Sequence, residues 1–571
     1  MKTAIRTLQL TLILVATALS TLWATTLQAD PKLPDWLGLD AEYRVQTRYI
    51  DPLELNGLTA RSVHYTQQRF RLETSLMPIK QVAIVSQIDM LGGVLFGDNG
   101  YYGGDPAPNS GLALTSRFPN HAGWTVGPVD GGDPFNPDDY GLVLRGIEPI
   151  HINYLYGKVV LPFGLLQVGR QPATTGPGIN LHDGSRTNRW GVSSYAPAAD
   201  RFLFATKLDE AILRIARGKK HKADNSMDNG VFLGFVYDIA VEDSIGYGGD
   251  NLHQLGGLIQ WKAVKPRLFG WDWDSFLLQV SLGGRFGDPY KTRLSWCRHK
   301  KSCEYTAHHT QVLAGTILLE VGAGPVHFSG ELIRLGGHTR EISEGMAALR
   351  ESDEAMRVVH DQDILAYGAR GILDIEVGPV TGTLEFDYAS GDADPRDDTR
   401  LTTFNYSRDA NVGLLLFEHI LAFETARSAG VGIENLQNVG AKSFPLTELS
   451  SEGRVHNAII AFPQVLYRPW ESFHVRLGAL FAWSAAPVTD SIMTLLSEDG
   501  NQIKDDAVNW HGGKPARYYG TEFDLQLEWR YRKYFQWTVE SAVLVPGAAL
   551  QDEAGDAVPS FLIENRFTFI F

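Results

Sequence analysis

Four arginines in the first half of the chain have the chemistry to bind anions. They are Arg170, Arg186, Arg189 and Arg201. A guanidinium group offers a planar fork of donors that suits a carboxylate or a phosphate. The first of them ends an extended stretch and opens a segment that contains Gly176-Pro177-Gly178. If that segment folds inward, the arginines form an electropositive constriction. The alternative is that they pair with acids of the same region, such as Asp183 and Asp200.

A second cluster is acidic and suits a hard cation. Its members are Asp392, Asp394, Asp397 and Asp398. Calcium prefers oxygen ligands of this kind, so the cluster is a candidate calcium site. A solvated acidic loop is the alternative interpretation.

Cys297 and Cys303 are the two cysteines of the chain. In an exported protein their closeness predicts a small local disulfide. The neighbouring histidines His299, His308 and His309 do not complete a recognised metal-ligand spacing with them, and we predict no metal site at these cysteines and histidines.

Motifs for catalysis are missing from the sequence. It contains no H-E-x-x-H, C-x-x-C-H, phosphate-binding Walker loop or G-x-S-x-G. Isolated histidines such as His151 and His182 are interpreted as polar wall or loop residues. We therefore expect neither an enzyme nor a bound cofactor.

The last strand indicates the element that positions these residues. Side chains on one face of it are Phe561, Ile563, Phe567, Phe569 and Phe571. The other face carries Leu562, Glu564, Arg566, Thr568 and Ile570. This alternation is typical of a barrel wall with lipid outside and water inside. A terminal strand ending in Phe567, Phe569 and Phe571 also resembles the signal that the barrel assembly machinery recognises.

Similar alternation recurs along the whole chain and predicts an all-β, antiparallel transmembrane barrel of eighteen strands. The expected strands are 37–49, 61–77, 81–91, 146–161, 165–172, 201–217, 230–241, 251–264, 275–287, 310–322, 326–336, 364–377, 380–391, 453–467, 473–484, 516–532, 535–546 and 560–571. Region 201–229 is the weakest, and a hairpin lost or added there gives 16 or 20 strands. A soluble sandwich, with the two faces reversed in meaning, is the alternative fold.

Tight connections set the direction of the strands. Turns are expected at 77–80, 161–164, 322–325, 378–379, 469–472 and 532–534. Barrels of this kind have short periplasmic turns and long extracellular loops. Three of the long loops, 92–145, 173–200 and 392–452, can reach into a lumen that eighteen strands leave too wide for side chains to fill. Val412–Arg427 within the last loop has helical spacing and is expected to pack on the wall or the mouth.

The N-terminus resembles a secretory signal. Lys2 and Arg6 precede an apolar stretch, and cleavage is expected after Ala29. An uncleaved membrane anchor is the alternative. Residues 30–571 then form a single barrel domain, since no linker-like change of composition interrupts them. The formal charge of −15 argues against nucleic acid as a partner.

Two stretches resemble the alginate-export family of porin-like outer-membrane barrels. One is Glu385–Asp398 with Thr403-Phe404-Asn405 after it, and the other is Val168–Pro172. The resemblance implies eighteen strands, passive diffusion without a cofactor, and a monomer in preference to a trimer. A polyanion as the solute does not carry over, because the expected lumen carries both basic and acidic side chains.

The sequence thus predicts a passive, porin-like channel for a polar or charged solute in the outer membrane of a Gram-negative bacterium. Expected partners are outer-membrane lipid and lipopolysaccharide, the barrel assembly machinery and the small polar solute. One alternative is a scaffold barrel that houses or anchors a partner for secretion or electron transfer. An outer-membrane enzyme is a further alternative, for which a Ser/His or paired-carboxylate cluster at the rim is needed.

Overall fold

A computed structural model describes most of the chain after the N-terminal 32 residues. The described residues are 33–55, 62–98, 123–128, 140–145, 148–172, 176–182, 188–193, 198–218, 224, 226–240, 252–268, 270–287, 292–293, 305–306, 309–340, 359–393, 399–407, 410–425, 451, 453–490 and 508–571. The expected signal segment, residues 1–29, and its cleavage site lie outside them.

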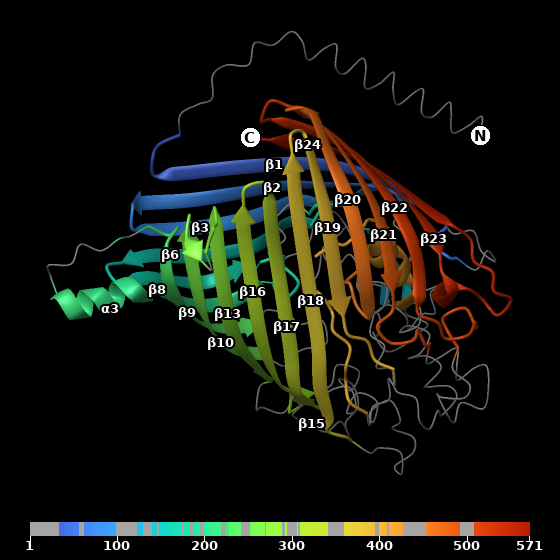
Figure 1. Ribbon diagram of the computed structural model, residues 1–571. Helices are drawn as coiled ribbons and strands as arrows, with labels where there is room; N and C mark the ends of the chain where they lie inside the picture. Colours follow the sequence, from blue (N-terminus) through green and yellow to red (C-terminus); the bar gives the residue numbers. More distant parts are fainter. Residues whose placement is uncertain are drawn as a thin grey trace, which may run out of the picture.

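Eighteen strands pair with their neighbours in one antiparallel sheet, which closes where the first strand pairs with the last (Figure 1). The barrel strands are β1 (Leu37–Asp51), β2 (Val63–Ile79), β3 (Val82–Asp98), β6 (Glu148–Leu161), β7 (Gly164–Pro172), β8 (Ala198–Lys207), β9 (Gly230–Ala240), β10 (Leu252–Val264), β13 (Ser275–Gly287), β16 (Gln311–Ala323), β17 (Val326–Thr339), β18 (Gln362–Val377), β19 (Val380–Ala389), β20 (Ala458–Trp470), β21 (Phe473–Trp483), β22 (Tyr518–Tyr531), β23 (Phe535–Pro546) and β24 (Ser560–Ile570). Each expected strand has its counterpart, so the eighteen-stranded barrel is confirmed.

The two ends of the barrel differ in the length of their connections. At one end, the short-turn end, two- or three-residue turns join strands at 80–81, 162–163, 324–325, 378–379, 471–472 and 532–534. Gly324 and Gly378 have positive φ angles of 55° and 58°, a backbone conformation that glycine adopts without steric cost. The opposite end, the long-loop end, carries the extended connections. The expected turns are confirmed, with the first shifted to Lys80-Gln81.

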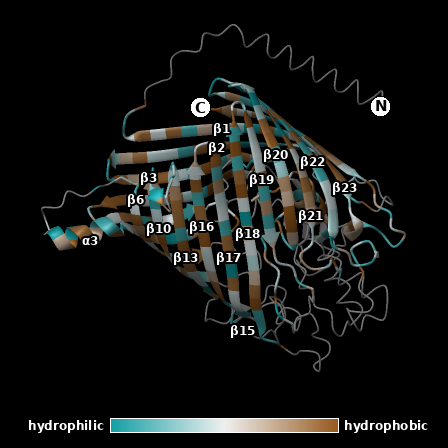
Figure 2. Cartoon of the chain, viewed as in Figure 1, coloured by the Kyte–Doolittle hydropathy of each residue, from teal (hydrophilic) through white to brown (hydrophobic). Residues whose placement is uncertain are grey.

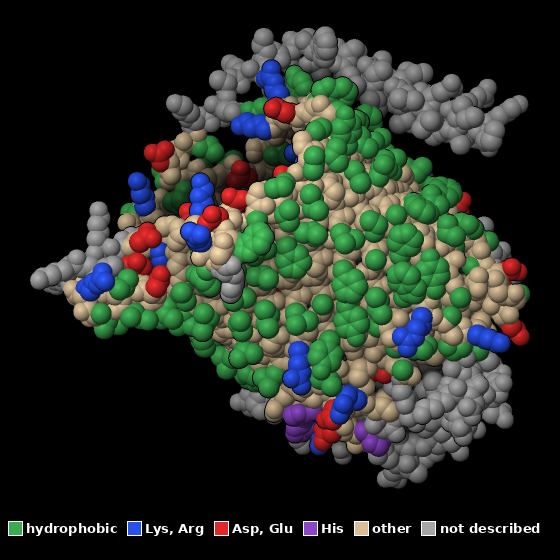
Figure 3. All heavy atoms as spheres, in the orientation of Figure 1, with side chains coloured by type: hydrophobic (Ala, Val, Ile, Leu, Met, Phe, Trp, Pro, Cys, Tyr) green, Lys and Arg blue, Asp and Glu red, His purple; other side chains and the backbone are tan. Residues whose placement is uncertain are grey.

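The outside of the barrel is an apolar belt (Figures 2 and 3). Leu282 and Leu313 of the outer face are 70% and 71% exposed. Such exposure of large aliphatic side chains on adjacent strands is typical of a lipid-facing surface. Aromatic residues gather near both ends of the strands, including Tyr49 and Phe561 at the long-loop end and Trp529 and Phe535 at the short-turn end. These are the interfacial girdles of a transmembrane barrel.

The terminal strand β24 follows its expected pattern. Phe561 and Ile563 are exposed on the outer face, whereas Leu562, Glu564 and Arg566 on the inner face are buried. On the outside Phe569 stacks on Tyr43 of β1, with ring centroids 6.2 Å apart, across the seam that closes the barrel.

The expected strand 201–217 is wrong in its second half. The strand β8 ends at Lys207, and Leu208–Arg217 forms the helix α3. Leu208, Ala211, Ile212 and Ile215 are spaced three or four residues apart, which favours a helix over a strand. The helix lies in the connection to β9 at the short-turn end, so the strand count is unchanged.

Short elements complete the described part of the chain. Three small sheets are β4 (Gly123–Pro128) with β5 (Tyr140–Arg145), β11 (Arg267–Leu268) with β12 (Trp271–Asp272), and β14 (Thr292–Arg293) with β15 (Tyr305–Thr306). The π-helix η6 (Leu416–Leu421) and the 3-10 helix η7 (Ala548–Leu550) belong to long loops. Among the helices of the described ranges, none has the length and apolar character required to cross a membrane.

Candidate functional site: the barrel lumen

Two stretches of long loop fold against the inner face of the barrel. We call residues 176–182 and 188–193 the first inner segment, and residues 399–407 and 410–425 the second inner segment. Between them, the two segments contact inner-face residues of β16–β23, β1 and β2. We call the wall formed by these strands and β24 the covered wall. The strands β6–β10 and β13 form the open wall. This division is the main feature of the lumen.

Side chains of the wall hold the first inner segment through its backbone. The Ile179 N–H donates to Glu331 Oε2 of β17 at 3.1 Å, and the Gly191 N–H donates to Glu540 Oε1 of β23 at 3.0 Å. Arg69 of β2 donates to the Ser193 carbonyl oxygen at 3.5 Å. The segment therefore spans the lumen from β17 to β23 and β2.

Trp190 is the main apolar contact of the first inner segment. Its side chain is 1% exposed, stacks on Phe462 of β20 with centroids 5.9 Å apart, and lies under the Arg476 guanidinium. The indole Nε1 donates to Gln464 Oε1 at 3.1 Å, so the buried polar atom is satisfied.

A single carboxylate on β22 binds the start of the helical part of the second inner segment. Glu522 accepts hydrogen bonds from the N–H groups of Leu414, Leu415 and Leu416 at 2.7, 2.9 and 2.7 Å. These N–H groups precede or begin η6, where backbone donors have no partner within the helix. A carboxylate at this end also complements the helix dipole. The helix expected within 412–427 is therefore confirmed, and it lies inside the barrel against the wall.

The second inner segment is apolar around most of its circumference. Leu415, Leu416, Ile420, Leu421 and Phe423 are each fully buried. They belong to one cluster with inward residues of the covered wall, including Ile460, Phe462, Leu480 and Tyr519. This burial is the hydrophobic core of the molecule, and it lies within the barrel.

The motif at 390–404 turns the chain back into the lumen. Ser390 Oγ donates to the Thr402 carbonyl oxygen at 2.7 Å, and Thr402 Oγ1 donates to the Gly391 carbonyl oxygen at 2.9 Å. The Phe404 N–H donates to the Ser390 carbonyl oxygen at 2.9 Å. A Cβ on Gly391 would collide with Asn457, so the turn requires glycine there. These bonds start the second inner segment.

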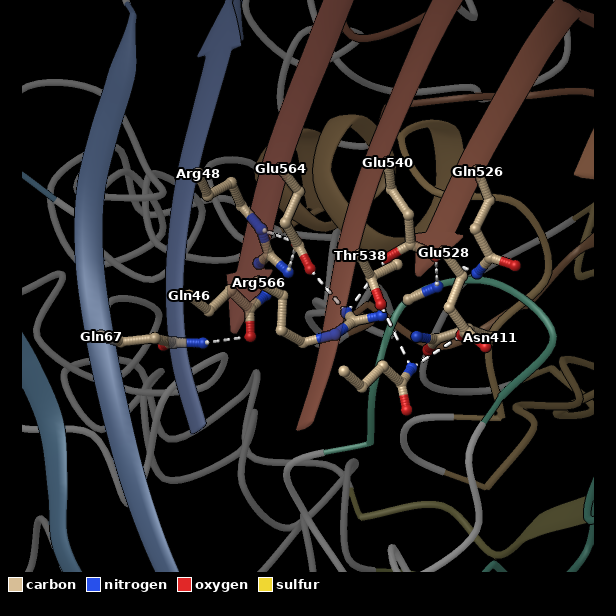
Figure 4. A network of polar contacts seen from close by, with 12 residues as sticks. Gln46, Arg48, Gln67, Asn411, Gln526, Glu528, Thr538, Glu540, Glu564 and Arg566 are labelled. Atoms are coloured by element: carbon tan, nitrogen blue, oxygen red, sulfur yellow. Dashed lines mark hydrogen bonds and ion pairs between the residues drawn. The ribbon is translucent and has the colours of Figure 1, made fainter. Parts of the chain in front are cut away.

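One polar part of the covered wall is a network in which charges neutralise one another (Figure 4). Arg48 of β1 binds Glu564 of β24 at 2.6 Å. Arg566 contacts both Glu564 at 2.8 Å and Glu540 at 3.0 Å. Gln526 donates to Glu540 at 2.6 Å. Glu540 also receives the Gly191 N–H, so this network joins the wall to the first inner segment.

One arginine of the covered wall differs from this pattern. Arg44 of β1 is 7% exposed and lies directly opposite Arg69 of β2 in the strand pairing. Arg69 pairs with Glu42 at 2.6 Å, and Arg71 pairs with Asp89 at 2.7 Å. Arg44 forms no ion pair with any residue that the structure describes.

The open wall is polar and keeps water access. Lys158, Gln260 and Lys262 occupy inward positions on β6 and β10 and are partly exposed, and Arg285 on β13 is exposed. Gln260 and Gln279 bond across β10 and β13 at 2.8 Å. Lys158 and Lys262 form no ion pair with the described residues. Figure 3 shows the molecule hollowed at the short-turn end, with Lys, Arg, Asp and Glu side chains around the hollow.

The predicted arginine constriction is not assembled as expected. Arg170 shares the outer face of β7 with Val168 and pairs with Asp200 at 3.1 Å, so it does not line the lumen. Successive side chains of a strand point to opposite faces, and the inward positions of β7 are 169 and 171, so the side chain at position 170 points outward. The alternative, pairing with Asp200, is what the structure shows for this residue.

Two of the other arginines do face inward, each bound to an acid. Arg189 in the first inner segment binds Asp374 of β18 through both oxygens, at 2.9 and 2.6 Å. Arg201 of β8 donates from Nε and Nη2 to the two carboxylate oxygens of Asp238 on β9, each at 2.7 Å. Arg186 lies outside the described residues. The structure thus separates the three described arginines: Arg170 lies on the outer face, Arg189 in the first inner segment and Arg201 on the open wall.

The remaining predicted sites fall mostly outside the described residues. Asp394, Asp397 and Asp398 of the calcium hypothesis do so, and so do Cys297 and Cys303 of the predicted disulfide. Asp392 accepts a hydrogen bond from the Thr402 N–H at 3.2 Å, which gives it a role in the turn. Across the described ranges no three His, Cys, Asp or Glu residues group closely enough to hold a metal ion.

Sequence reasoning did not single out the carboxylates that hold the inner segments. In the sequence these residues are indistinguishable from other inward positions of amphipathic strands; they are Glu331, Glu522 and Glu540. An available signal was the unbroken apolar run Leu414-Leu415-Leu416-Phe417, which has no polar face to present to water. Such a segment must be buried, and an eighteen-stranded lumen is the place for it.

Two titratable groups of the long-loop end are perturbed. Burial raises the pKa of the Tyr406 phenol well above its ordinary value, and the neighbouring Asp387 carboxylate raises it further. The Tyr406 hydroxyl donates to the Ala369 carbonyl oxygen at 2.7 Å. Burial lowers the pKa of His456, while its contact with the Arg454 carbonyl oxygen acts in the opposite direction. Both groups are therefore neutral near pH 7.

Comparisons with known proteins give only distant structural similarity. No protein-family model matches the chain, and no curated protein matches it. Among solved structures, the outer membrane protein opdK from Pseudomonas aeruginosa is similar at 9% identity and a TM-score of 0.42, over 94% of this chain and 98% of that one. OccAB1 of Acinetobacter baumannii gives 9% and 0.44, over 93% and 96%.

An anion-selective porin from Comamonas acidovorans gives 8% identity and a TM-score of 0.35, over 94% of this chain and 99% of that one. At such values the assignment rests on the chain's own strand pairing and outer surface. By those features the protein is a closed, eighteen-stranded, antiparallel transmembrane β-barrel.

Proposed function

We propose that the protein is an outer-membrane channel through which small polar or charged solutes diffuse passively. The short-turn end then faces the periplasm and the long-loop end faces the exterior. The observation that carries the proposal is the open wall, where the inward side chains of Lys158, Gln260 and Lys262 are polar and partly exposed although the opposite wall is covered. A barrel that served only as a solid scaffold has no need of such a wall.

We further propose that the channel prefers anions. The open wall carries Lys158 and Lys262 on its inner face, and its carboxylate Asp238 is already bound by Arg201. Uncompensated positive charge along a water-filled path lowers the electrostatic barrier for anions and raises it for cations.

The test is a planar-bilayer recording of the purified, refolded protein. Under a potassium chloride gradient the reversal potential reports the preference, and Lys158→Gln with Lys262→Gln is expected to shift it toward cation selectivity. The matched control is Arg334→Gln, because Arg334 lies on the outer face of β17 beside the exposed Leu332. No conductance in the wild type contradicts the channel. An unchanged reversal potential in the double variant contradicts only the anion preference.

A scaffold barrel is the second candidate, and one observation favours it. The protein's own inner segments cover β16–β24, β1 and β2, so part of the lumen is filled. A periplasmic partner that co-purifies with the protein, together with absent conductance, would support the scaffold. Catalysis is not proposed, because the sequence contains none of the common hydrolase, metalloprotease, haem or nucleotide motifs.

We propose that the protein is related to the alginate-export family. The support for this proposal is the motif at 385–405, whose described residues form the turn that starts the second inner segment. Export of alginate itself is tested by comparing the entry of alginate oligomers of increasing length into vesicles that contain the protein. We also propose insertion by the barrel assembly machinery through Phe567, Phe569 and Phe571, contact with lipopolysaccharide, and a monomeric state.

A further inference from the structure

The helix α3 presents an apolar face that the barrel does not cover. Ile212 is 56% exposed and Ile215 is 86% exposed. With Leu208 and Ala211 these residues recur every three or four positions, so they lie on one side of the helix. None of the ten residues of α3 is buried. A helix of this length is marginal in water without a surface against which to pack.

The helix is nevertheless well defined by its ends. Asp209 and Glu210 occupy the first turn, Arg214 and Arg217 the last turn, and these charges complement the helix dipole. Gly218 ends the helix with a φ of 61°. Lys207, which precedes the helix, donates to Asp224 and Ser226 of the same connection at 3.0 and 3.1 Å. The sequence therefore specifies a helix here.

The apolar face of α3 continues the lipid-facing belt of the barrel. The strand before it bears Phe202 on its outer face, and Phe204 packs on the exposed Phe163 of the neighbouring turn, with centroids 6.2 Å apart. Figure 1 shows α3 projecting sideways from the short-turn end, and Figure 3 shows hydrophobic side chains along its lower edge in line with those of the wall.

Charge near α3 is opposite in sign to that of the whole chain. The protein carries −15, whereas Arg214 and Arg217 end the helix and the sequence goes on to Lys219, Lys220 and Lys222. An apolar face beside clustered Lys and Arg is typical of helices that lie in a membrane interface and bind anionic headgroups.

We propose that α3 is an interfacial helix that lies in the membrane leaflet next to the short-turn end, with Ile212 and Ile215 among the acyl chains and Arg214 and Arg217 at phospholipid phosphates. It extends the contact of the barrel with lipid beyond the strands, and in doing so fixes the depth and tilt of one side of the barrel. This role is additional to the channel and does not depend on conductance.

Depth-dependent fluorescence tests the proposal on the full protein. In a Cys297→Ser, Cys303→Ser background, an environment-sensitive NBD label is placed by Ile215→Cys or, as the matched control on the opposite side of the same helix, by Arg217→Cys. Both proteins are reconstituted in vesicles of phosphatidylethanolamine and phosphatidylglycerol with and without brominated acyl chains. The label at 215 is expected to show blue-shifted emission and strong quenching, and the label at 217 weaker quenching.

A water-like, unquenched label at position 215 overturns the proposal, as does equal quenching at both positions. A second measurement uses the unmodified protein. Amide hydrogen exchange of 208–217 is expected to be slower in these vesicles than in a lipid-free amphiphilic polymer. No difference between the two media contradicts a lipid-bound helix. Protection that depends on the amount of protein per vesicle assigns the face to a second copy and also contradicts the proposal.

Discussion

The covered wall and the open wall are made of the same strands and turns, yet they face the lumen with different chemistry. On β20 the inward residues Ala458, Ile460 and Phe462 are apolar and fully buried. On β10 three of the inward residues, Gln254, Gln260 and Lys262, are polar and partly exposed, and the inward Leu258 is only partly buried. The barrel thus combines a packed interior on one side with a solvated surface on the other.

The difference shows how a wide barrel gains a core without losing a water path. A lumen of eighteen strands is too wide to be filled by wall side chains alone. Here the second inner segment supplies the missing apolar volume, and wall carboxylates satisfy its backbone N–H groups. The core stabilises one half of the barrel, and the other half remains available to solutes.

Removing Glu522 is expected to have the largest effect on this asymmetry. In Glu522→Ala three N–H groups of residues 414–416 lose a charged acceptor inside the protein. At ~1.5–3 kcal/mol for each bond, this costs about 4.5–9 kcal/mol of unfolding free energy. The second inner segment is then released and single-channel conductance rises. Thermal unfolding followed by circular dichroism and bilayer recording measure the two effects.

Gln260→Ala on the open wall is the control for this variant, because Gln260 loses only its bond to Gln279. We expect nearly unchanged stability and conductance for it. Equal effects of the two substitutions would show that the walls do not differ in the way described.

Truncating Trp190 tests the first inner segment. Trp190→Ala removes the stacking on Phe462 and leaves Gln464 without its indole donor, and we expect a loss of about 3 kcal/mol. Leu258→Ala, on an inward position of β10, is the comparison and should cost less because Leu258 is only partly buried. The midpoint of denaturant unfolding is the measurement. A larger loss for Leu258→Ala than for Trp190→Ala would reverse the assignment of the core to the covered wall.

Arg189→Ala is expected to act more weakly. Its pair with Asp374 is bidentate but partly exposed, with 30% and 22% of the two side chains accessible, so solvent screening limits the loss to about 1–2 kcal/mol. The freed Asp374 carboxylate adds negative charge and should move the reversal potential toward cations. Arg170→Ala, on the outer face, should leave the reversal potential unchanged. An equal shift of the reversal potential in both variants would indicate that Arg170 lines the pore.

Acidification is expected to destabilise the covered wall by a small amount through His456. Burial lowers its pKa in the folded protein, so the unfolded chain binds the proton more readily. The stabilising contribution is complete above the unfolded pKa of about 6.5 and decreases as the pH falls through the folded pKa. In His456→Gln the melting temperature should change less between pH 7 and pH 5 than it does in the wild type. The expected direction would be contradicted if acidification raised the melting temperature of the wild type but not that of His456→Gln.

Much of the fold could be predicted because a barrel strand is specified locally. The period of two on β22 and β24 and the turns at Gly324 and Gly378 need no knowledge of distant residues. The same local evidence misplaced 208–217, where apolar residues three and four positions apart favour a helix. Attention to that spacing would have ended the strand at Lys207.

The site was less predictable because its contacts join distant parts of the chain. Glu540 meets Gly191, and Glu331 meets Ile179, across long sequence separations that no local pattern reports. Arg170 illustrates the difficulty: a shift of one position decides whether a side chain of a strand faces lipid or water. The helix in 412–427 was found from its spacing, but its partner Glu522 was not.

The Glu540–Gly191 contact joins residues that are 349 positions apart, and this separation constrains the order in which the molecule can be completed. During synthesis from the N-terminus, the first inner segment exists long before β23 does. It must stay unbound, or bind provisionally, until the last three strands arrive and β24 meets β1. Contacts of such high sequence separation are slow to form and leave apolar surface exposed meanwhile. Trp190 and the apolar run 414–417 are therefore the segments that most need protection by a chaperone before the barrel closes.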